Sequence, residues 1–194
     1  MESHGGYFCR FEDVDASWLA QLAREAVEED GQLSSDCGLQ VTVLGTPGIV
    51  RFAYDAPFTY GRKGARWYLT HHALARRLSE HLGLTVHAYV FDALDLEQVV
   101  AYGNGHRVGG EVLRYEDSEL PEDDDERTFE RLKGKWPLGH LARVFGVARE
   151  ELIRIPRRPT LLLDLGGSQA PQPLWQLFPE PVRARRSHEL YARG

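Results

Sequence analysis

Alternating apolar and polar residues predict strands in several parts of the chain. Residues 6–11 (GYFCRF) read as a short strand near the beginning of the chain. Residues 39–45 and 48–54 are alternating, β-branched runs joined at Thr46-Pro47, and we expect them to form a hairpin. Residues 84–91 (LTVHAYVF) predict a further strong strand. These runs predict a sheet whose neighbouring strands are mostly antiparallel.

Residues 97–116 carry the clearest local signal in the chain. Two alternating runs flank Asn104-Gly105, a pair that tolerates the positive φ angles of a tight hairpin turn. The second run contains Gly109-Gly110, which would permit a bulge or the close approach of another backbone. We therefore expect a two-stranded hairpin with an irregularity in its second strand.

Apolar residues at helical spacing predict amphipathic helices between these strands. Asp13 or Asp15 is expected to cap a helix that extends to about Glu29. Thr70 is expected to cap the next helix, which Gly83 ends. Residues 137–147 and 148–155 predict a pair of short helices joined by a turn, with Phe145, Val147 and Leu152 packing on the sheet.

The order of these elements predicts an α+β fold, in which helices pack against a mostly antiparallel sheet. Residues 158–167 (RPTLLLDLGG) are a candidate buried strand. The 194 residues, 42% of them hydrophobic, suit a single domain with an appended tail. We place the domain at residues 1–167 and a Pro-rich, basic C-terminal extension at residues 168–194.

Composition narrows the classes of partner and the compartment. The chain has no apolar run long enough to span a membrane, and residues 1–12 lack the pattern of a secretory signal, so we expect a cytoplasmic protein. Cys9 and Cys37 are then expected to be thiols, and two cysteines are too few for a cysteine-based zinc knuckle. The net charge of −6 disfavours binding to nucleic acid and to membrane surfaces.

Four histidines fall within residues 70–87, which raises the question of a metal site. His71 and His72 are adjacent, so on a helix their side chains point about 100° apart. His81 follows His71 by a rise of about 15 Å, too far for one zinc ion with bonds of about 2 Å. We expect His71 on the apolar face, His72 on the exposed face, and no assigned partner for His87. The sequence thus predicts no metal, no cofactor and no catalytic constellation.

The acidic run at residues 116–126 is the second candidate site. Its acids are contiguous and lack the glycine and alternating oxygen positions of an EF-hand, which disfavours calcium binding. A solvated loop explains the run, and so does a surface that recognises a basic partner. For the second interpretation the contact residues are Glu122, Asp123, Asp124 and Asp125, with Trp136 as an aromatic anchor.

Residues 68–155 also resemble a group of known proteins. The helix, strand and Asn-Gly hairpin that ends in EVLRYED, followed by an acidic loop and LARVFGVAREEL, are similar to small bacterial immunity proteins of polymorphic toxin systems. The resemblance implies a cytoplasmic protein that binds another macromolecule, a toxin, and carries out no chemistry.

Three functions follow as hypotheses. The first is a non-catalytic protein-binding module, in one version an immunity protein that neutralises a basic toxin. The second is a small hydrolase or nuclease that uses the histidines near residues 71–87. The third is a structural subunit of a larger bacterial assembly, which docks through its C-terminal tail from Pro171 to Arg193.

Overall fold

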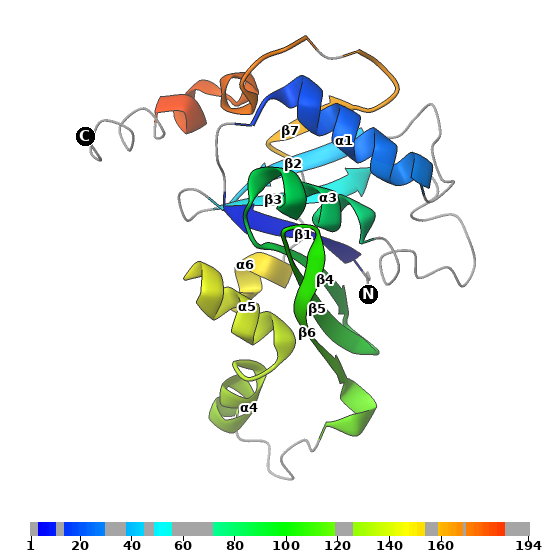
Figure 1. Ribbon diagram of the computed structural model, residues 1–194. Coiled ribbons are helices and arrows are strands. Elements are labelled where there is room, and N and C mark those ends of the chain that lie inside the picture. Colours follow the sequence, from blue (N-terminus) through cyan, green and yellow to red (C-terminus); the bar gives the residue numbers. More distant parts are fainter. Residues whose placement is uncertain are drawn as a thin grey trace. The chain divides into compact units, whose positions relative to one another are not determined.

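A computed structural model places most of the chain (Figure 1). It describes residues 4–10, 14–29, 38–44, 49–55, 72–118, 126–153, 159–168 and 170–184. The elements in chain order are β1 (His4–Arg10), α1 (Ala16–Glu29), β2 (Gly38–Val43), β3 (Ile49–Asp55), α3 (Ala73–Leu82), β4 (Val86–Asp92), β5 (Leu96–Gly103), β6 (His106–Arg114), η2 (Tyr115–Asp117), α4 (Glu126–Lys133), α5 (Pro137–Phe145), α6 (Arg149–Ile153), β7 (Leu161–Asp164) and η3 (Leu174–Leu177).

The strands form a seven-stranded antiparallel sheet in the order β6-β5-β4-β1-β3-β2-β7. The two hairpins expected from the sequence are present, because β2 pairs with β3 and β5 pairs with β6 in antiparallel register. Helices pack against the sheet, with α3 on β4 and β5, and α5 on β5. The predicted α+β class with a mostly antiparallel sheet is therefore confirmed.

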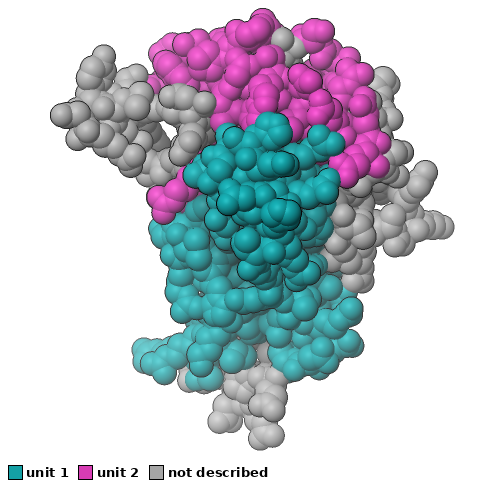
Figure 2. Space-filling view, viewed as in Figure 1, with its two compact units in different colours: residues 1–8, 68–155 teal, residues 9–67, 156–194 magenta. Residues whose placement is uncertain are grey.

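Two compact units make up the chain, and each contains segments distant in sequence (Figure 2). The first comprises residues 1–8 and 68–155, and the second comprises residues 9–67 and 156–194. Both contain large, fully buried aliphatic side chains, such as Leu78 and Leu141 in the first and Leu19 and Leu39 in the second. Each unit thus has its own hydrophobic core.

In the second unit, α1 begins where the sequence predicted. The Asp15 carboxylate accepts hydrogen bonds from the backbone N–H groups of Ser17 at 2.9 Å and Trp18 at 3.1 Å. A further bond from the Ser17 hydroxyl, together with these backbone bonds, lowers the pKa of Asp15, because they stabilise its charged form. Tyr54 on β3 donates its hydroxyl to the Ala23 carbonyl at 3.0 Å, which ties α1 to this strand.

The beginning of the C-terminal extension packs within this same unit. Leu174 and Phe178 are buried, and the Leu174 N–H donates to the Val14 carbonyl at 2.7 Å. The Ala16 N–H donates to the Gln172 carbonyl at 2.8 Å. The basic residues from 185 onward lie outside the described residues. Residues 172–178 therefore contribute contacts to the core around α1.

The expectation that residues 158–167 form a strand is confirmed by β7, but the expectation that this strand is buried is wrong. β7 is shorter and lies at one end of the sheet, paired with β2. Leu163 is buried, whereas Leu162 is 52% exposed. The sequence LLLD alone does not indicate which of its leucines is exposed. Whether one face of a strand or both are covered depends on the position of the strand in the sheet.

In the first unit, helices cover both faces of strands β4 and β5. On one face, the Ser79 hydroxyl of α3 accepts a hydrogen bond from the Gly105 N–H at 3.0 Å. On the other face, Phe145 of α5 contacts the rings of Phe8 at 5.9 Å and His87 at 5.4 Å between centroids. The expected packing of Phe145 on the sheet is confirmed by its contact with Phe8, while Leu152 is fully buried and Val147 is half-buried.

The hairpin turn has the predicted geometry. Asn104 and Gly105 have φ angles of 48° and 76°, the left-handed values of a tight turn that suits twisted strands. Ala101 pairs with Gly109 and Tyr102 pairs with Arg107, so Val108 is an extra residue in β6. The predicted irregularity is a bulge, placed one residue before the glycine pair.

Candidate functional site

Most of the predicted partner-binding residues lie outside the described part of the chain. Glu122, Asp123, Asp124 and Asp125 are among the residues that the structure does not describe. Trp136, the predicted anchor, is described and half-buried immediately before α5. The described residues that flank the acidic run therefore define the candidate site.

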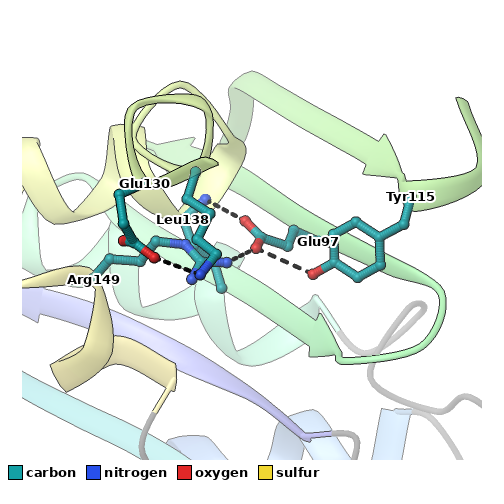
Figure 3. Close-up of polar contacts among 6 residues, drawn as sticks. Glu97, Tyr115, Glu130, Leu138 and Arg149 are labelled. Carbon is teal, nitrogen blue, oxygen red and sulfur yellow. Dashed lines mark hydrogen bonds and ion pairs between the residues drawn. The ribbon is translucent and has the colours of Figure 1, made fainter. Parts of the chain in front are cut away.

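A buried carboxylate lies at the centre of this region. The Glu97 side chain on β5 is completely buried. It accepts a hydrogen bond from the Leu138 N–H at 3.1 Å and another from the Tyr115 hydroxyl at 3.1 Å (Figure 3). It also forms an ion pair with the Arg149 guanidinium. A buried charge needs such partners, because moving it out of water is costly.

The strand pairing explains why Glu97 points toward the helices. Glu97 lies opposite Phe91 on β4, and Val99, two residues further on, lies opposite Tyr89. These residues share the sheet face that carries Phe8 and that α5 covers. Glu97 therefore meets the beginning of α5, where the Leu138 N–H belongs to the first helical turn and has no carbonyl partner in its own helix.

Arg149 reaches the same carboxylate from the beginning of α6. Burial lowers the pKa of its guanidinium, and the nearby Glu150 carboxylate has the opposite effect. The guanidinium carbon also lies 5.6 Å from the centre of the Trp136 ring, within the range of a cation–π contact. Arg149 thus joins α6, β5 and the residue that precedes α5.

Tyr115, the first residue of η2 directly after β6, completes the group. Burial, together with the negative charge of Asp92, raises the pKa of its phenol to about 12. The hydroxyl therefore stays protonated at neutral pH and donates to Glu97. The ring packs against Trp136 with 5.3 Å between centroids. The Tyr115 carbonyl accepts bonds from both the N–H and the hydroxyl of Ser118.

We call these five residues, Glu97, Tyr115, Trp136, Leu138 and Arg149, the Glu97 clamp. Tyr115 immediately precedes the acidic run, and Trp136 follows it after α4. The contact between these two rings closes a chain segment of residues 116–135 at its base. The clamp therefore orders Tyr115 and Trp136, the described residues at the two ends of this segment.

Reasoning from sequence did not find this clamp. Glu97 and Arg149 are 52 positions apart in the sequence. The residues next to each of them give no indication that the two side chains pair. A signal was nevertheless present in the sequence. Glu97, Val99 and Ala101 occupy alternate positions of a strong strand, so Glu97 points to the same face of the sheet as these apolar residues. A carboxylate at such a position requires a buried cation or several donors.

The described histidines do not converge. His72 packs on Tyr102 with 5.6 Å between ring centres, on the face covered by α3, whereas His87 lies on the opposite face beside Phe145. His81 is exposed, and His71 lies outside the described residues. Within the described ranges, no three His, Cys, Asp or Glu side chains form a group that could hold a metal ion.

Two expectations about this histidine region need correction. The helix begins at Ala73 rather than after Thr70, with His72 in the N-cap position. His72 is consequently half-buried instead of exposed, because a residue that precedes the helix does not follow the helical face pattern. The predicted end of the helix is confirmed by Gly83, whose φ is 63°.

The semi-buried His87 leads to a prediction about pH. Burial lowers the pKa of its imidazole below 6.5, and its Nδ1 atom has no hydrogen-bond partner among the described residues. As pH falls below 6.5, the unfolded chain takes up a proton that the folded chain binds more weakly, so stability decreases. We expect His87→Phe, which keeps a ring beside Phe145, to reduce this loss.

Urea unfolding of the wild type and the variant at pH 7.5 and pH 5 tests this expectation. The exposed His81→Asn change is the matched control and should leave the pH dependence of the wild type intact. An unchanged pH dependence in His87→Phe would show that other groups account for the loss of stability at low pH.

Asp92 and the cysteines, two further sets of candidate residues, have structural roles or are not described. Asp92 forms a turn at the end of β4, where its carboxylate accepts a hydrogen bond from the Leu94 N–H at 3.0 Å. Cys9 is a buried thiol, and Cys37 is not among the described residues. In the part of the chain that the structure describes, no helix is long and apolar enough to cross a membrane.

Comparison with known proteins places the chain in no family. No protein-family model matches the sequence, and no curated protein or solved structure is significantly similar to it. The residues themselves therefore carry the functional conclusion.

Proposed function

We propose that this protein is a non-catalytic protein-binding module, which presents an acidic segment to a basic protein. The segment is residues 116–126, and the proposed contacts are Glu122, Asp123, Asp124 and Asp125. An immunity protein that occludes a basic toxin is the specific version that we favour. The Glu97 clamp is the observation that carries this proposal.

The distribution of charge supports a dedicated acidic surface. Eight of the eleven residues 116–126 are acidic and none is basic. This negative charge exceeds the net charge of the whole chain, −6, so the remaining residues carry a small positive excess. Concentrated charge of one sign attracts an oppositely charged partner over distances of a Debye length, about 8–10 Å at moderate salt, and accelerates association.

The clamp supports the proposal because it gives the acidic segment a fixed base. Glu116 and Asp117 are exposed directly after Tyr115, whose hydroxyl and ring are both held. A binding segment whose ends are already ordered loses less conformational freedom when a partner binds. Trp136 keeps part of its surface exposed at this base, which suits the anchoring role proposed for it.

The experiment compares two variants that each lack four negative charges. One carries Glu122→Gln, Asp123→Asn, Asp124→Asn and Asp125→Asn. The control carries Glu25→Gln, Glu28→Gln, Glu29→Gln and Glu180→Gln, which lie outside the segment. Each chain is used to capture proteins from native lysate, and the association rate of the captured protein is then measured at increasing ionic strength.

We expect the captured partner to be basic and its association with the wild type to slow steeply as salt is added. The variant of residues 122–125 should associate about tenfold more slowly or worse, because steering contributes factors of about 10–1,000. The control should behave like the wild type. Equal rates for the two four-charge variants, or rates insensitive to salt, would contradict the proposal.

A further inference from the structure

Strand β6 is an exposed sheet edge. It lies at one end of the strand order and pairs with β5. In the ranges that the structure covers, no strand pairs with its outer side. All seven residues from His106 to Val112 are exposed, and Val112 is 62% exposed. An edge of this kind offers unpaired backbone groups to another strand.

The register identifies which residues of β6 present these groups. The Tyr115 N–H donates to the Asp95 carbonyl at 2.9 Å, so this pair is hydrogen-bonded across the hairpin. Antiparallel pairs alternate, so Leu113 and Glu111 also bond to β5. Gly110, Val112 and Arg114 therefore direct their N–H and C=O groups away from the sheet.

We propose that β6 pairs with β6 of a second copy of this chain, antiparallel and about a two-fold axis at Val112. The three outward residues are symmetric about Val112, so Gly110 of each copy lies opposite Arg114 of the other. All three residue pairs can then exchange both of their backbone hydrogen bonds. The result is an isologous dimer, in which the two sheets become continuous.

The side chains fit this register. Val112 meets its own counterpart, which removes an exposed apolar side chain from water. Arg114 lies opposite Gly110, which has no side chain of its own, although the Arg107 side chain of the same strand lies over it. On the other face Glu111 lies opposite Leu113, and the Glu111 carboxylate is already bound by His140 of α5 at 2.6 Å. A register centred on Glu111 would instead place two like charges directly opposite each other.

The positive charge of Arg107 opposes the pairing of the two β6 strands. The strength of the dimer should therefore depend on salt. The terminal nitrogen of Arg107 lies 2.8 Å from the position that a Cβ on Gly110 would occupy. The approach of Arg114 from the second copy therefore brings two cations together. Salt screens this repulsion, so the dimer should become stronger as salt is added. The proposed binding of a basic partner should weaken with salt, which separates the two proposals.

The test measures sedimentation of the purified full chain over a wide range of protein concentration, at low and high salt. Val112→Pro removes an N–H that faces away from β5, so it blocks the edge without removing a bond of the hairpin. Val112→Glu is a second variant, which places two negative charges at the axis. Val144→Glu removes an equally accessible valine from α5 and serves as the control.

We expect a concentration-dependent dimer in the wild type and the control, and an association constant lower by about tenfold or more in both Val112 variants. Val112→Cys should also form a disulfide-linked dimer on mild oxidation, because paired residues have Cα atoms about 5.5 Å apart. Val144→Cys should not. A wild type that is monomeric at every concentration, or a folded Val112→Glu variant that dimerises normally, would overturn the proposal.

Discussion

Replacing Glu97 by alanine is expected to lower the free energy of unfolding by about 3–5 kcal/mol, because it leaves Arg149 as a buried charge without its partner. The Leu138 N–H and the Tyr115 hydroxyl lose their acceptor as well. Each buried donor left without an acceptor adds about 1–3 kcal/mol, although these effects overlap and do not simply add. Urea unfolding measures the change.

Two further variants separate the charge from the packing. Glu111→Ala removes an acid that is 53% exposed on the neighbouring strand, and should cost about 1 kcal/mol or less. The double variant Glu97→Leu/Arg149→Met replaces both charges by apolar side chains and should recover much of the stability lost in Glu97→Ala. A loss in Glu97→Ala no larger than that in Glu111→Ala would contradict the role assigned to the clamp.

The second large effect is expected at the C-terminal end of the described chain. Truncation after Ser168 removes the buried side chains of Leu174 and Phe178. Replacing a buried leucine by alanine lowers the free energy of unfolding by about 2–5 kcal/mol, and replacing a buried phenylalanine lowers it by about 3–5 kcal/mol. The truncation also removes backbone hydrogen bonds to Val14 and Ala16. The combined loss is comparable with the total stability of a typical domain, about 5–15 kcal/mol, so we expect the second unit to unfold.

Truncation after Ala184 is the matched control, because it removes ten residues and none of these contacts. Circular dichroism and urea unfolding should show a cooperative transition close to that of the full chain. The comparison also tests the hypothesis that the tail is a docking arm of an assembly. That hypothesis requires a chain that ends at residue 168 to fold normally and to lose only its ability to assemble.

Local sequence patterns predicted the elements whose formation depends on near neighbours. The hairpin turn at Asn104-Gly105 was predictable because these two residues readily adopt the positive φ angles that it requires. α1 begins where the Asp15 carboxylate caps the first backbone N–H groups, and α3 ends at Gly83 for a similarly local reason. The pairing of β2 with β3 follows from two alternating runs close together in the chain.

Features that depend on the environment of an element were predicted less well. β7 was expected to be buried, but it lies at an end of the sheet with Leu162 exposed. His72 was expected on an exposed helical face, but it precedes the helix and packs on Tyr102. In both cases the outcome depends on neighbouring elements that the local sequence pattern does not specify.

The sequence by itself determined the α+β class, the hairpins, the beginning of α1, the end of α3 and the concentration of negative charge in residues 116–126. Only the tertiary structure brought Glu97 and Arg149 together and left the outer side of β6 exposed. The physical reason is the range of the interactions. Turns, caps and periodicity act over a few residues, whereas a buried charge needs partners that only the packed fold brings to it.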